Sequence, residues 1–326
     1  MYISRDVVLL ITHSGDFFTV DRVAQSLLKF GAQPFRLDTD KFPIALQLKM
    51  HVGNSESNSR LIYGENSISN EQVQAVWMRR IWQPKLSKDL APQFQAACTR
   101  ESLATLEGFW DSLREARWVD NLQRINAAEN KLRQLRLAQE VGLVIPRTLV
   151  TNNAEEVREF FSEVKGKMVA KLLTPLSQSM SGSSFFLYTS AVKEEDLLEL
   201  ESLRHSPMVF QEQIPKLREL RVVFVDGKLF VGALDASVYS TSTVDWRNYN
   251  TDTCMWQPHD LPSEIAFRLK IFMATFGLVF GAFDFIQTPA GEYVFLEVNP
   301  TGEWGMLERD LGYPISEAIA QALLCK

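Results

Sequence analysis

The chain has 326 residues, of which 46% are hydrophobic and 23% are charged, and its formal net charge at pH 7 is -6. This length and apolar content suffice for two or three domains with buried cores. Acidic and basic residues are interspersed along the chain, so we expect no binding to nucleic acid or to an anionic membrane.

The three cysteines, Cys98, Cys254 and Cys325, lie far apart, and no CxxC motif or Cys/His cluster accompanies them. This pattern predicts neither a zinc site nor a disulfide framework, and it fits a reducing cytoplasm. The first apolar run, residues 7–11, is too short for a signal peptide or for a membrane span of about 20 residues. We therefore predict a soluble, cytoplasmic protein.

The first part of the chain has the pattern of an α/β domain. Residues 7–11 are predicted to be a buried strand, and an apolar-periodic helix follows over about residues 20–30 and ends at Gly31. A second strand over residues 73–78 leads into Arg79-Arg80, where a structural ion pair is favoured over a contact with an anion. Residues 53–69 are polar and predict a loop or irregular hairpin, and a long helix covers about residues 102–113. Residues 1–122 form this predicted N-terminal domain.

Residues 123–206 are predicted to form a central unit. Asn126, with Glu129 three residues later, predicts a capping box for a helix that ends at Gly142. Asn153 is predicted to cap the next helix. The elements expected after it are a strand over residues 168–173, a polar loop over 177–184, a strand over 185–189 and an acidic amphipathic helix over 193–203.

Residues 207–326 are predicted to form a third unit. Its expected elements are strands over residues 208–214, 220–225 and 229–233, a helix over about 264–276, a hairpin over 281–300 and a closing helix over 315–324. The fold class is thus α/β (α+β).

The hairpin over residues 281–300 carries the clearest chemical signal. Its turn, Pro289-Ala-Gly-Glu292, lies midway between Asp284 and Glu297, so a symmetric hairpin places these carboxylates directly opposite each other. Asn299 shares the face of Glu297, while Leu296 and Val298 point into the core. Facing carboxylates need a neutralising charge, and Mg2+ bound through oxygen supplies one. An edge hairpin with solvated acids is the alternative, which the apolar flanking residues disfavour.

Other segments offer ligands of phosphate and nucleotide, each with a structural alternative. Lys171, within an apolar strand, either contacts phosphate or reaches solvent at an edge. The loop that contains Ser181 and Gly182 either closes over phosphate with its backbone amides or is a flexible turn. Glu219 and Arg221 share one face of a strand, where they either bind ribose and phosphate or form a structural ion pair.

The segment Gln211-Glu212-Gln213-Ile214 ends a strand just before Pro215. The proline interrupts the sheet, so we expect backbone donors and acceptors there to remain unpaired and able to contact an adenine edge. An ordinary linker between domains is the alternative.

In this order along residues 126–326, the segments resemble the ATP-grasp ligases. The resemblance implies that ATP binds between the central and C-terminal domains and that residues 1–122 form a pre-ATP-grasp domain. It further implies contacts of Lys131, Lys171 and Arg221 with ATP phosphates, and of Glu219 with ribose. Gln211 to Ile214 would be the adenine hinge, and Asp284, Glu297 and Asn299 would hold Mg2+.

Three segments resemble one branch of that family, the microviridin-type maturases of ribosomal peptides. They are Phe35-Arg-Leu-Asp-Thr-Asp-Lys-Phe-Pro43, Val76-Trp-Met-Arg-Arg80 and Glu297-Val-Asn-Pro-Thr-Gly-Glu-Trp304. Members are ATP-dependent enzymes that cyclise a precursor peptide through its side chains. The segments around Trp77-Met-Arg-Arg-Ile-Trp82 and Gly302-Glu-Trp-Gly305 are more similar to the amide-forming than to the ester-forming members.

The resemblance implies that a Glu or Asp side chain of the peptide becomes an acyl phosphate, which a Lys amine then attacks to form a lactam. Lys171 and Arg221 would offset charge on the transferred phosphoryl group. Arg247 would steady the acyl phosphate and Asp245 would orient or deprotonate the amine, whose unperturbed pKa is about 10.4; a plain surface loop is the alternative.

The partners that the resemblance implies are a precursor peptide with a helical leader and a second copy in a homodimer. Asp196 and Glu199, three residues apart on one helix face, would bind the leader unless this face is only solvated. Three other functions remain open: an ester-forming member, an amino-acid ligase that extends a peptide terminus, and a nucleotide-binding protein without catalysis.

Overall fold

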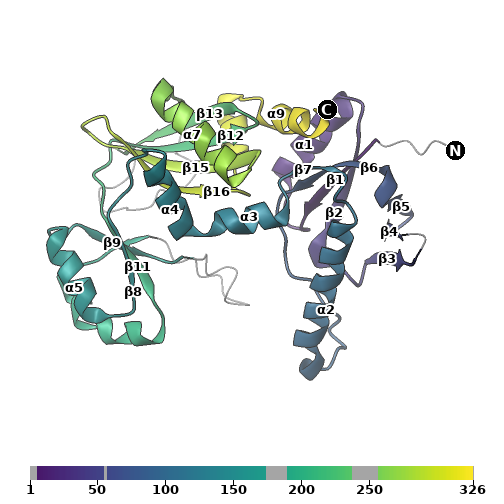
Figure 1. Cartoon of the computed structure of the whole chain (residues 1–326), viewed down its shortest axis with the longest axis horizontal. Coiled ribbons are helices and arrows are strands. Elements are labelled where there is room, and N and C mark those ends of the chain that lie inside the picture. The colour runs from purple at the N-terminus through teal and green to yellow at the C-terminus, as the bar shows by residue number, and fades with distance from the viewer. Residues whose placement is uncertain (1–5, 55–56, 174–188, 237–255, 326) are drawn as a thin grey trace.

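The computed structural model describes residues 6–54, 57–173, 189–236 and 256–325 (Figure 1). Its first sheet is parallel, with the strand order β2-β1-β6-β7. The strands are β1 (Val7–Thr12), β2 (Gln33–Asp38), β6 (Val73–Met78) and β7 (Arg117–Val119). Every residue of β1 is buried, as expected of a central parallel strand. The predicted strands over residues 7–11 and 73–78 are confirmed.

Two long helices flank this sheet. Helix α1 (Phe18–Lys29) begins two residues before the predicted start, and Gly31 follows it with a positive φ of 80°. Helix α2 (Pro92–Asp111) begins ten residues earlier than predicted, with Pro92 in its first turn, where a missing N–H has no cost. The polar residues that precede residue 102 therefore belong to the helix.

Of the predicted loop or irregular hairpin over residues 53–69, the hairpin is confirmed, and its strands are regular. Strands β3 (Leu46–Val52), β4 (Ser57–Tyr63) and β5 (Asn66–Ser69) form an antiparallel sheet of their own. Leu46, Leu61 and Ile68 are its buried anchors, and most of its other side chains are exposed, which explains the weak apolar signal. Two short 3-10 turns, η1 (Thr39–Lys41) and η2 (Asn70–Gln72), complete this half of the chain.

Two consecutive helices connect the N-terminal sheet to the rest of the molecule (Figure 1). They are α3 (Leu122–Glu129) and α4 (Lys131–Glu140), capped by the side chains of Asn121 and Asn130. The prediction that Asn126 caps a helix is wrong, because Asn126 lies inside α3. Gly142 follows α4 with a φ of 83°, so the predicted glycine stop is confirmed.

The central part is a small antiparallel sheet covered by helix. Its strand order is β10-β9-β11-β8, with β8 (Thr148–Thr151), β9 (Met168–Lys171), β10 (Ser190–Ala191) and β11 (Met208–Glu212). Helix α5 (Ala154–Glu163) packs on it and is capped by Asn153, as predicted.

The predicted acidic helix over residues 193–203 is two short 3-10 helices instead, η3 (Glu194–Leu198) and η4 (Leu200–His205). The carboxylate of Asp196 accepts the Lys193 N–H, a local bond that competes with a continuous α-helix.

The third sheet is antiparallel and carries the predicted hairpin. Its strand order is β14-β13-β12-β15-β16, with β12 (Arg218–Val225), β13 (Lys228–Asp235), β14 (Gln257–Pro258), β15 (Phe280–Gln287) and β16 (Tyr293–Asn299). Along β12, Leu220, Val222 and Phe224 pack in the cluster that includes α4 and α7 (Ser263–Phe276). Val223 and Val225 face the opposite cluster. The sheet is therefore covered on both faces.

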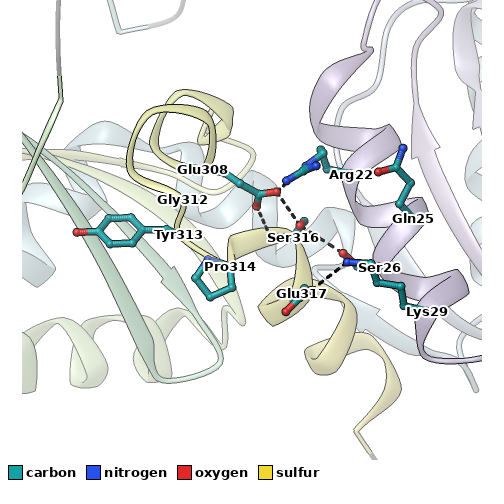
Figure 2. Close-up of a pocket in the computed structure, with 10 residues that line it drawn as sticks. All are labelled: Arg22, Gln25, Ser26, Lys29, Glu308, Gly312, Tyr313, Pro314, Ser316 and Glu317. Atoms are coloured by element: carbon teal, nitrogen blue, oxygen red, sulfur yellow. Dashed lines mark hydrogen bonds and ion pairs between the residues drawn. The ribbon is translucent and has the colours of Figure 1, made fainter.

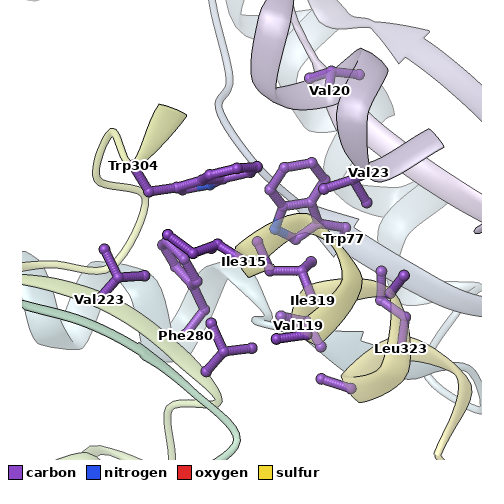
Figure 3. Close-up of a cluster of buried hydrophobic side chains, with 14 of the residues drawn as sticks. Val20, Val23, Trp77, Val119, Val223, Phe280, Trp304, Ile315, Ile319 and Leu323 are labelled. Atoms are coloured by element: carbon purple, nitrogen blue, oxygen red, sulfur yellow. The ribbon is translucent and has the colours of Figure 1, made fainter. Parts of the chain in front are cut away.

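The closing helices join this sheet to the N-terminal sheet. Helix α8 (Gly305–Leu311) is followed by α9 (Ile315–Leu324), as predicted for residues 315–324. Figure 3 shows α9 residues Ile315, Ile319 and Leu323 packed between Trp77 and Val119 of one sheet and Val223 and Phe280 of the other. One hydrophobic cluster thus spans both sheets.

Asp120, which follows β7, adds a polar connection between the same two sheets. Its buried carboxylate accepts the backbone N–H of Val279 at 2.9 Å and of Phe280 at 3.0 Å. Burial raises the pKa of Asp120 to about 6, although these two backbone donors act in the opposite direction.

None of the helices in the described part of the chain is long and apolar enough to cross a bilayer.

Candidate functional site

Asp284 and Glu297 are directly paired across the hairpin, as predicted, but the hairpin is not symmetric. The register shifts by one residue between Asp284 and Phe285, so that Phe285 pairs with Phe295. This bulge reverses the expected direction of the residue before Glu297: Phe295 is fully buried, and Leu296 is only half-buried. The prediction that Leu296 points into the core is wrong.

Cationic side chains neutralise the facing carboxylates. Lys131 Nζ, at the start of α4, lies 2.7 Å from Glu297 Oε2 and 3.4 Å from Asn299 Oδ1. Arg221 Nη1, on the strand next to β15, lies 3.1 Å from Asp284 Oδ1. The amide of Asn299 donates to Glu297 Oε1 at 3.1 Å. The five side chains therefore form one cluster of alternating charge.

Gln134, which the sequence did not single out, fixes the strand that carries Glu297 and Asn299. Its side chain is buried, and it both accepts the Val298 N–H at 2.9 Å and donates to the Val298 carbonyl at 2.8 Å. It also donates to the Ala128 carbonyl at the end of α3. Because Lys131 lies one turn earlier on the same helix, Gln134 sets the position of Lys131 relative to the two residues of β16 that Lys131 contacts.

The chain that leaves β16 is held from the other side by Arg79. This guanidinium is fully buried; it donates to the carbonyls of Thr301 and Gly302 and pairs with Glu303 at 2.6 Å. The expected structural ion pair at Arg79 is thus confirmed. Gly302 turns back against Asn299 so closely that a Cβ there would lie 2.5 Å from the Ala282 Cβ. This close packing requires glycine at position 302 and gives the structural reason for the glycine in the segment from Glu297 to Trp304.

Arg221 and Glu219 project from the same face of β12 toward the hairpin side, as predicted. Arg221 is 6% exposed, yet its Nε and Nη1 have no hydrogen-bond partner within the described chain, and the contact to Asp284 has ion-pair rather than hydrogen-bond geometry. Glu219 pairs with Lys216 at 2.5 Å. A buried guanidinium with unused donors is suited to a phosphate group.

The segment from Gln211 to Ile214 is only partly as expected. The Gln211 side chain is buried and donates to Thr148 Oγ1, and the amides of Glu212 and Gln213 donate to the carbonyls of Arg147 and Lys167. The expectation that the amides of Glu212 and Gln213 are unpaired is therefore wrong, because the backbone pairing of β11 extends as far as Gln213. No bond joins the Ile214 amide to another described residue.

Other predicted residues lie elsewhere. Lys171 is half-buried at the end of β9, opposite Val209 of β11. Asp196 lies within η3 and Glu199 directly follows it, and both are exposed. Ser181, Gly182, Asp245 and Arg247 lie outside the described residues.

The donor set of the hairpin fits Mg2+ better than a softer metal. Among the residues that the structure describes, no three or more His, Cys, Asp or Glu side chains form a metal-binding group. Two carboxylates and one amide are instead available at the hairpin, and Mg2+ typically takes one or two carboxylates and completes its shell with phosphate and water.

A pocket of about 180 Å³ lies between α1 and the α8–α9 turn, away from these residues (Figure 2). Its central carboxylate, Glu308, accepts from Arg22 at 2.8 Å and from the Ser316 N–H at 2.7 Å and hydroxyl at 2.8 Å. These bonds satisfy Glu308 and hold the first turn of α9. The pocket is therefore part of the connection between the sheets, and it contains none of the predicted ligands.

Comparisons with known proteins agree with the arrangement described above. Residues 7–126 match the family model "MvdD pre-ATP grasp domain", and residues 130–308 match "Prokaryotic glutathione synthetase, ATP-grasp domain". A search of the curated proteins gives no match.

Among the solved structures that cover nearly the whole chain, three are at least 30% identical to it. Macrocyclase MdnB from Microcystis aeruginosa MRC is 60% identical, with a TM-score of 0.84 over 98% of this chain and 100% of that one. Macrocyclase MdnC from the same organism, bound with precursor peptide MdnA, is 35% identical, with a TM-score of 0.89 and the same coverage. A RiPP-associated ATP-grasp ligase from Chryseobacterium gregarium, in complex with ADP and a leader and core peptide, is 30% identical over 98% of this chain and 96% of that one, with a TM-score of 0.90.

Proposed function

The chain belongs to the microviridin-type ATP-grasp maturases of ribosomal peptides, and from this membership we propose that it is a macrocyclase of a precursor peptide. As a member it is an ATP-dependent carboxylate-amine ligase. The observation that carries the proposal is the 60% identity to macrocyclase MdnB over 98% of this chain. In this chain, Asp284, Glu297 and Asn299 share one face of the hairpin. The predicted homodimer and cytoplasmic location stay predictions.

The proposed peptide partner has support from two relatives. MdnC was solved with the precursor peptide MdnA, and the Chryseobacterium gregarium ligase with a leader and a core peptide. We assign the leader to the surface formed by η3 and the residue that follows it, where Asp196 and Glu199 are exposed. A helical leader with a basic side chain would be complementary to them.

ATP and Mg2+ are the proposed cofactors. Asp284, Glu297 and Asn299 would hold the metal; the ammonium of Lys131 and the guanidinium of Arg221 now neutralise these carboxylates and would then face phosphate oxygens. Lys171, Ser181 and Gly182 would add contacts to phosphate, and Glu219 would bind ribose. At the adenine hinge the Ile214 amide is the available donor, whereas the buried Gln211 side chain supports the strand.

Bound Mg-ATP supplies the phosphoryl group that turns a Glu or Asp side chain of the peptide into an acyl phosphate. Arg221 stabilises negative charge on the transferred group, and its fixed position in β12 keeps the cost of reorganisation low. Arg247 is proposed to hold the acyl phosphate. Asp245 is proposed to take a proton from the attacking Lys amine, after which the amide bond forms and inorganic phosphate leaves.

We propose the lactam, rather than the ester, as the product. The two segments that resemble amide-forming members are in contact: Arg79 binds the carbonyl of Gly302 and the carboxylate of Glu303. Trp77 and Trp304, one from each segment, belong to the same buried cluster (Figure 3). These contacts make the two segments one structural unit, and the proposed lactam follows from the resemblance of both segments to amide-forming members.

Mass spectrometry tests this function directly. We expect the protein, incubated with ATP, Mg2+ and MdnA as the precursor, to remove one water per ring, and tandem fragmentation to locate each bond on a Lys nitrogen. Bonds to Ser or Thr oxygens would indicate the ester-forming alternative, and a gain in peptide mass would indicate an amino-acid ligase. An unchanged peptide mass with a leader that binds would contradict the proposal.

Replacing Gln134 by Leu is expected to weaken nucleotide binding rather than peptide binding. The change leaves the buried N–H and carbonyl of Val298 unpaired, at a cost of about 1–3 kcal/mol for each group. Because the strand that carries Glu297 and Asn299 then shifts relative to Lys131, KM for Mg-ATP should rise about tenfold while KM for the peptide stays constant.

Steady-state kinetics with each substrate varied in turn provides the measurement. Gln134→Glu, which can still accept the Val298 N–H, should recover part of the loss, and Gln139→Leu on the exposed face of the same helix is the matched control. Equal KM values for Mg-ATP in the Gln134→Leu variant and the unaltered protein would show that Gln134 does not position the site.

A further inference from the structure

We propose that Arg80 and the strand ends around it form a binding site for an acidic side chain of the peptide substrate, an inference that rests on the proposed function. The site lies at the carboxyl-terminal edge of the N-terminal sheet, where β1 and β6 end side by side. This edge of an open parallel sheet is where such folds bind their ligands.

The segments after β1 and β6 are folded against each other at this edge. The amides of Arg79 and Arg80 both donate to the Ile11 carbonyl, at 2.9 Å and 3.4 Å. Farther along, the Trp82 ring stacks on His13 with 3.7 Å between ring centroids and an interplanar angle of 5°. The two chain segments are therefore one rigid surface.

Most of the charges on this surface are matched. Asp38 pairs with Arg36 at 2.8 Å and with Lys41 at 3.0 Å, and Asp40 pairs with Lys85 at 2.7 Å. Two further charged side chains are buried there, Asp16 and Arg79, which face each other at 3.6 Å, and Arg79 is also bound to Glu303.

Arg80 is the exception on this surface. Its side chain is half-buried, and within the described ranges its guanidinium has no hydrogen bond and no ion pair. It nevertheless lies close to other positive and potentially positive groups, because its charge lowers the pKa of both Arg79 and His13, in each case after the larger effect of burial. An unpaired guanidinium held beside a second cation is electrostatically unfavourable until an anion binds it.

His13 shows that this surface is prepared for a further polar group. Its Nδ1 accepts the Gly15 N–H at 3.2 Å, so its Nε2 carries the hydrogen. That Nε2 is buried and has no acceptor within the described chain. A buried donor without a partner, next to an unpaired cation, is rare unless a ligand completes the site.

The position of Arg80 favours the peptide over the nucleotide as the source of the anion. Its neighbour Arg79 binds Thr301 to Glu303, shortly after Asn299, so the segment that carries Arg80 meets the end of the hairpin from the N-terminal domain. The cations assigned to phosphate, Lys131 and Arg221, approach the hairpin from α4 and β12 instead. A carboxylate of the peptide is the anion that such a cyclisation substrate presents, and a guanidinium binds it through two parallel hydrogen bonds.

Kinetics and binding with MdnA as the probe test the proposal. In Arg80→Gln we expect KM for MdnA, and its Kd measured by fluorescence anisotropy, to rise about tenfold or more, as the loss of one charge-assisted contact implies. KM for ATP should not change. Arg80→Lys should recover part of the affinity, and Arg114→Gln, at an exposed arginine in the turn after α2, should match the unaltered protein.

Substitutions in the peptide identify the group that is bound. Each Glu and Asp of MdnA is replaced in turn by Gln or Asn, and each peptide variant is measured with both proteins in a double-mutant cycle. The variant that lacks the carboxylate bound by Arg80 should bind the unaltered protein and Arg80→Gln with the same affinity. A rise in KM for ATP alone, or unchanged KM and Kd for MdnA, would overturn the inference while leaving cyclisation by the unaltered protein intact. Anisotropy measures binding of MdnA without turnover. A failure of the proposed function, seen as no cyclisation by the unaltered protein, is therefore distinguishable from a failure of the Arg80 site.

Discussion

Glu297→Gln is expected to reduce turnover by about 10²–10³-fold, the loss typical when one fixed electrostatic contact to a reacting group is removed. Gln keeps the size and the hydrogen-bonding shape of the side chain, so the change isolates the charge. Without it, only Asp284 remains as a carboxylate ligand, and the ammonium of Lys131 loses the partner that it now contacts at 2.7 Å. The rate of ADP release with saturating peptide measures the effect.

The hairpin itself supplies the matched control for this variant. Glu292 lies exposed in the turn of the same hairpin, so Glu292→Gln removes the same charge without touching the site. A magnesium titration should show that Glu297→Gln requires a higher Mg2+ concentration than the unaltered protein. The Mg2+ requirement of Glu292→Gln should be unchanged. If Glu297→Gln turned over at the unaltered rate and with the same Mg2+ requirement, the assignment of the metal to this hairpin would be wrong.

Arg221→Gln is expected to lower kcat/KM for ATP by about 10²–10³-fold, through the loss of the guanidinium that faces the transferred phosphoryl group. Arg221→Lys should restore only part of this, because an ammonium keeps the charge but not the planar pair of donors. The buried Nε and Nη1 of Arg221 lack hydrogen-bond partners in the described chain, so the change breaks no hydrogen bond of these two atoms within it.

Arg218, three residues earlier on β12, is the control position, because Arg218→Gln makes the same substitution on the same strand. Side chains alternate along a strand, so Arg218 points to the opposite face, and Arg218→Gln should leave kcat/KM for ATP unchanged. Thermal unfolding with and without Mg-ATP separates folding from binding, since a ligand stabilises only a protein that binds it. Equal nucleotide-induced shifts in Arg221→Gln and Arg218→Gln would exclude a role of Arg221 in nucleotide binding.

The hairpin shows how far local sequence rules reach. The turn signal at residues 289–292 and the alternation of side chains were enough to pair Asp284 with Glu297, which the structure confirms. They could not reveal the bulge, because a bulge is decided by packing against the rest of the core. There Phe295 takes the buried position next to Phe272 and Phe283, which is why Leu296 is displaced.

The helix caps show a second limit. Asn121, Asn126, Asn130 and Asn153 are all chemically able to cap a helix, and the sequence favoured Asn126 because of the Glu that follows it. The structure uses the two neighbours, Asn121 and Asn130, as caps of two short helices. The break between them allows Lys131 to begin a new helix, with its ammonium against Glu297. Competing caps are resolved by such tertiary contacts and not by propensity.

The sequence by itself indicated the strands over residues 7–11 and 73–78, the glycine stops at Gly31 and Gly142 and the pairing of Asp284 with Glu297, because each depends on neighbours within a few positions. The tertiary structure alone decided what holds those residues in place. Gln134 bonds Val298 from 164 residues away, and Arg79 bonds Thr301 from 222 residues away. Such contacts leave no periodic trace in the chain, since they depend on how whole helices and sheets pack, and packing is set by the complete set of apolar surfaces at once.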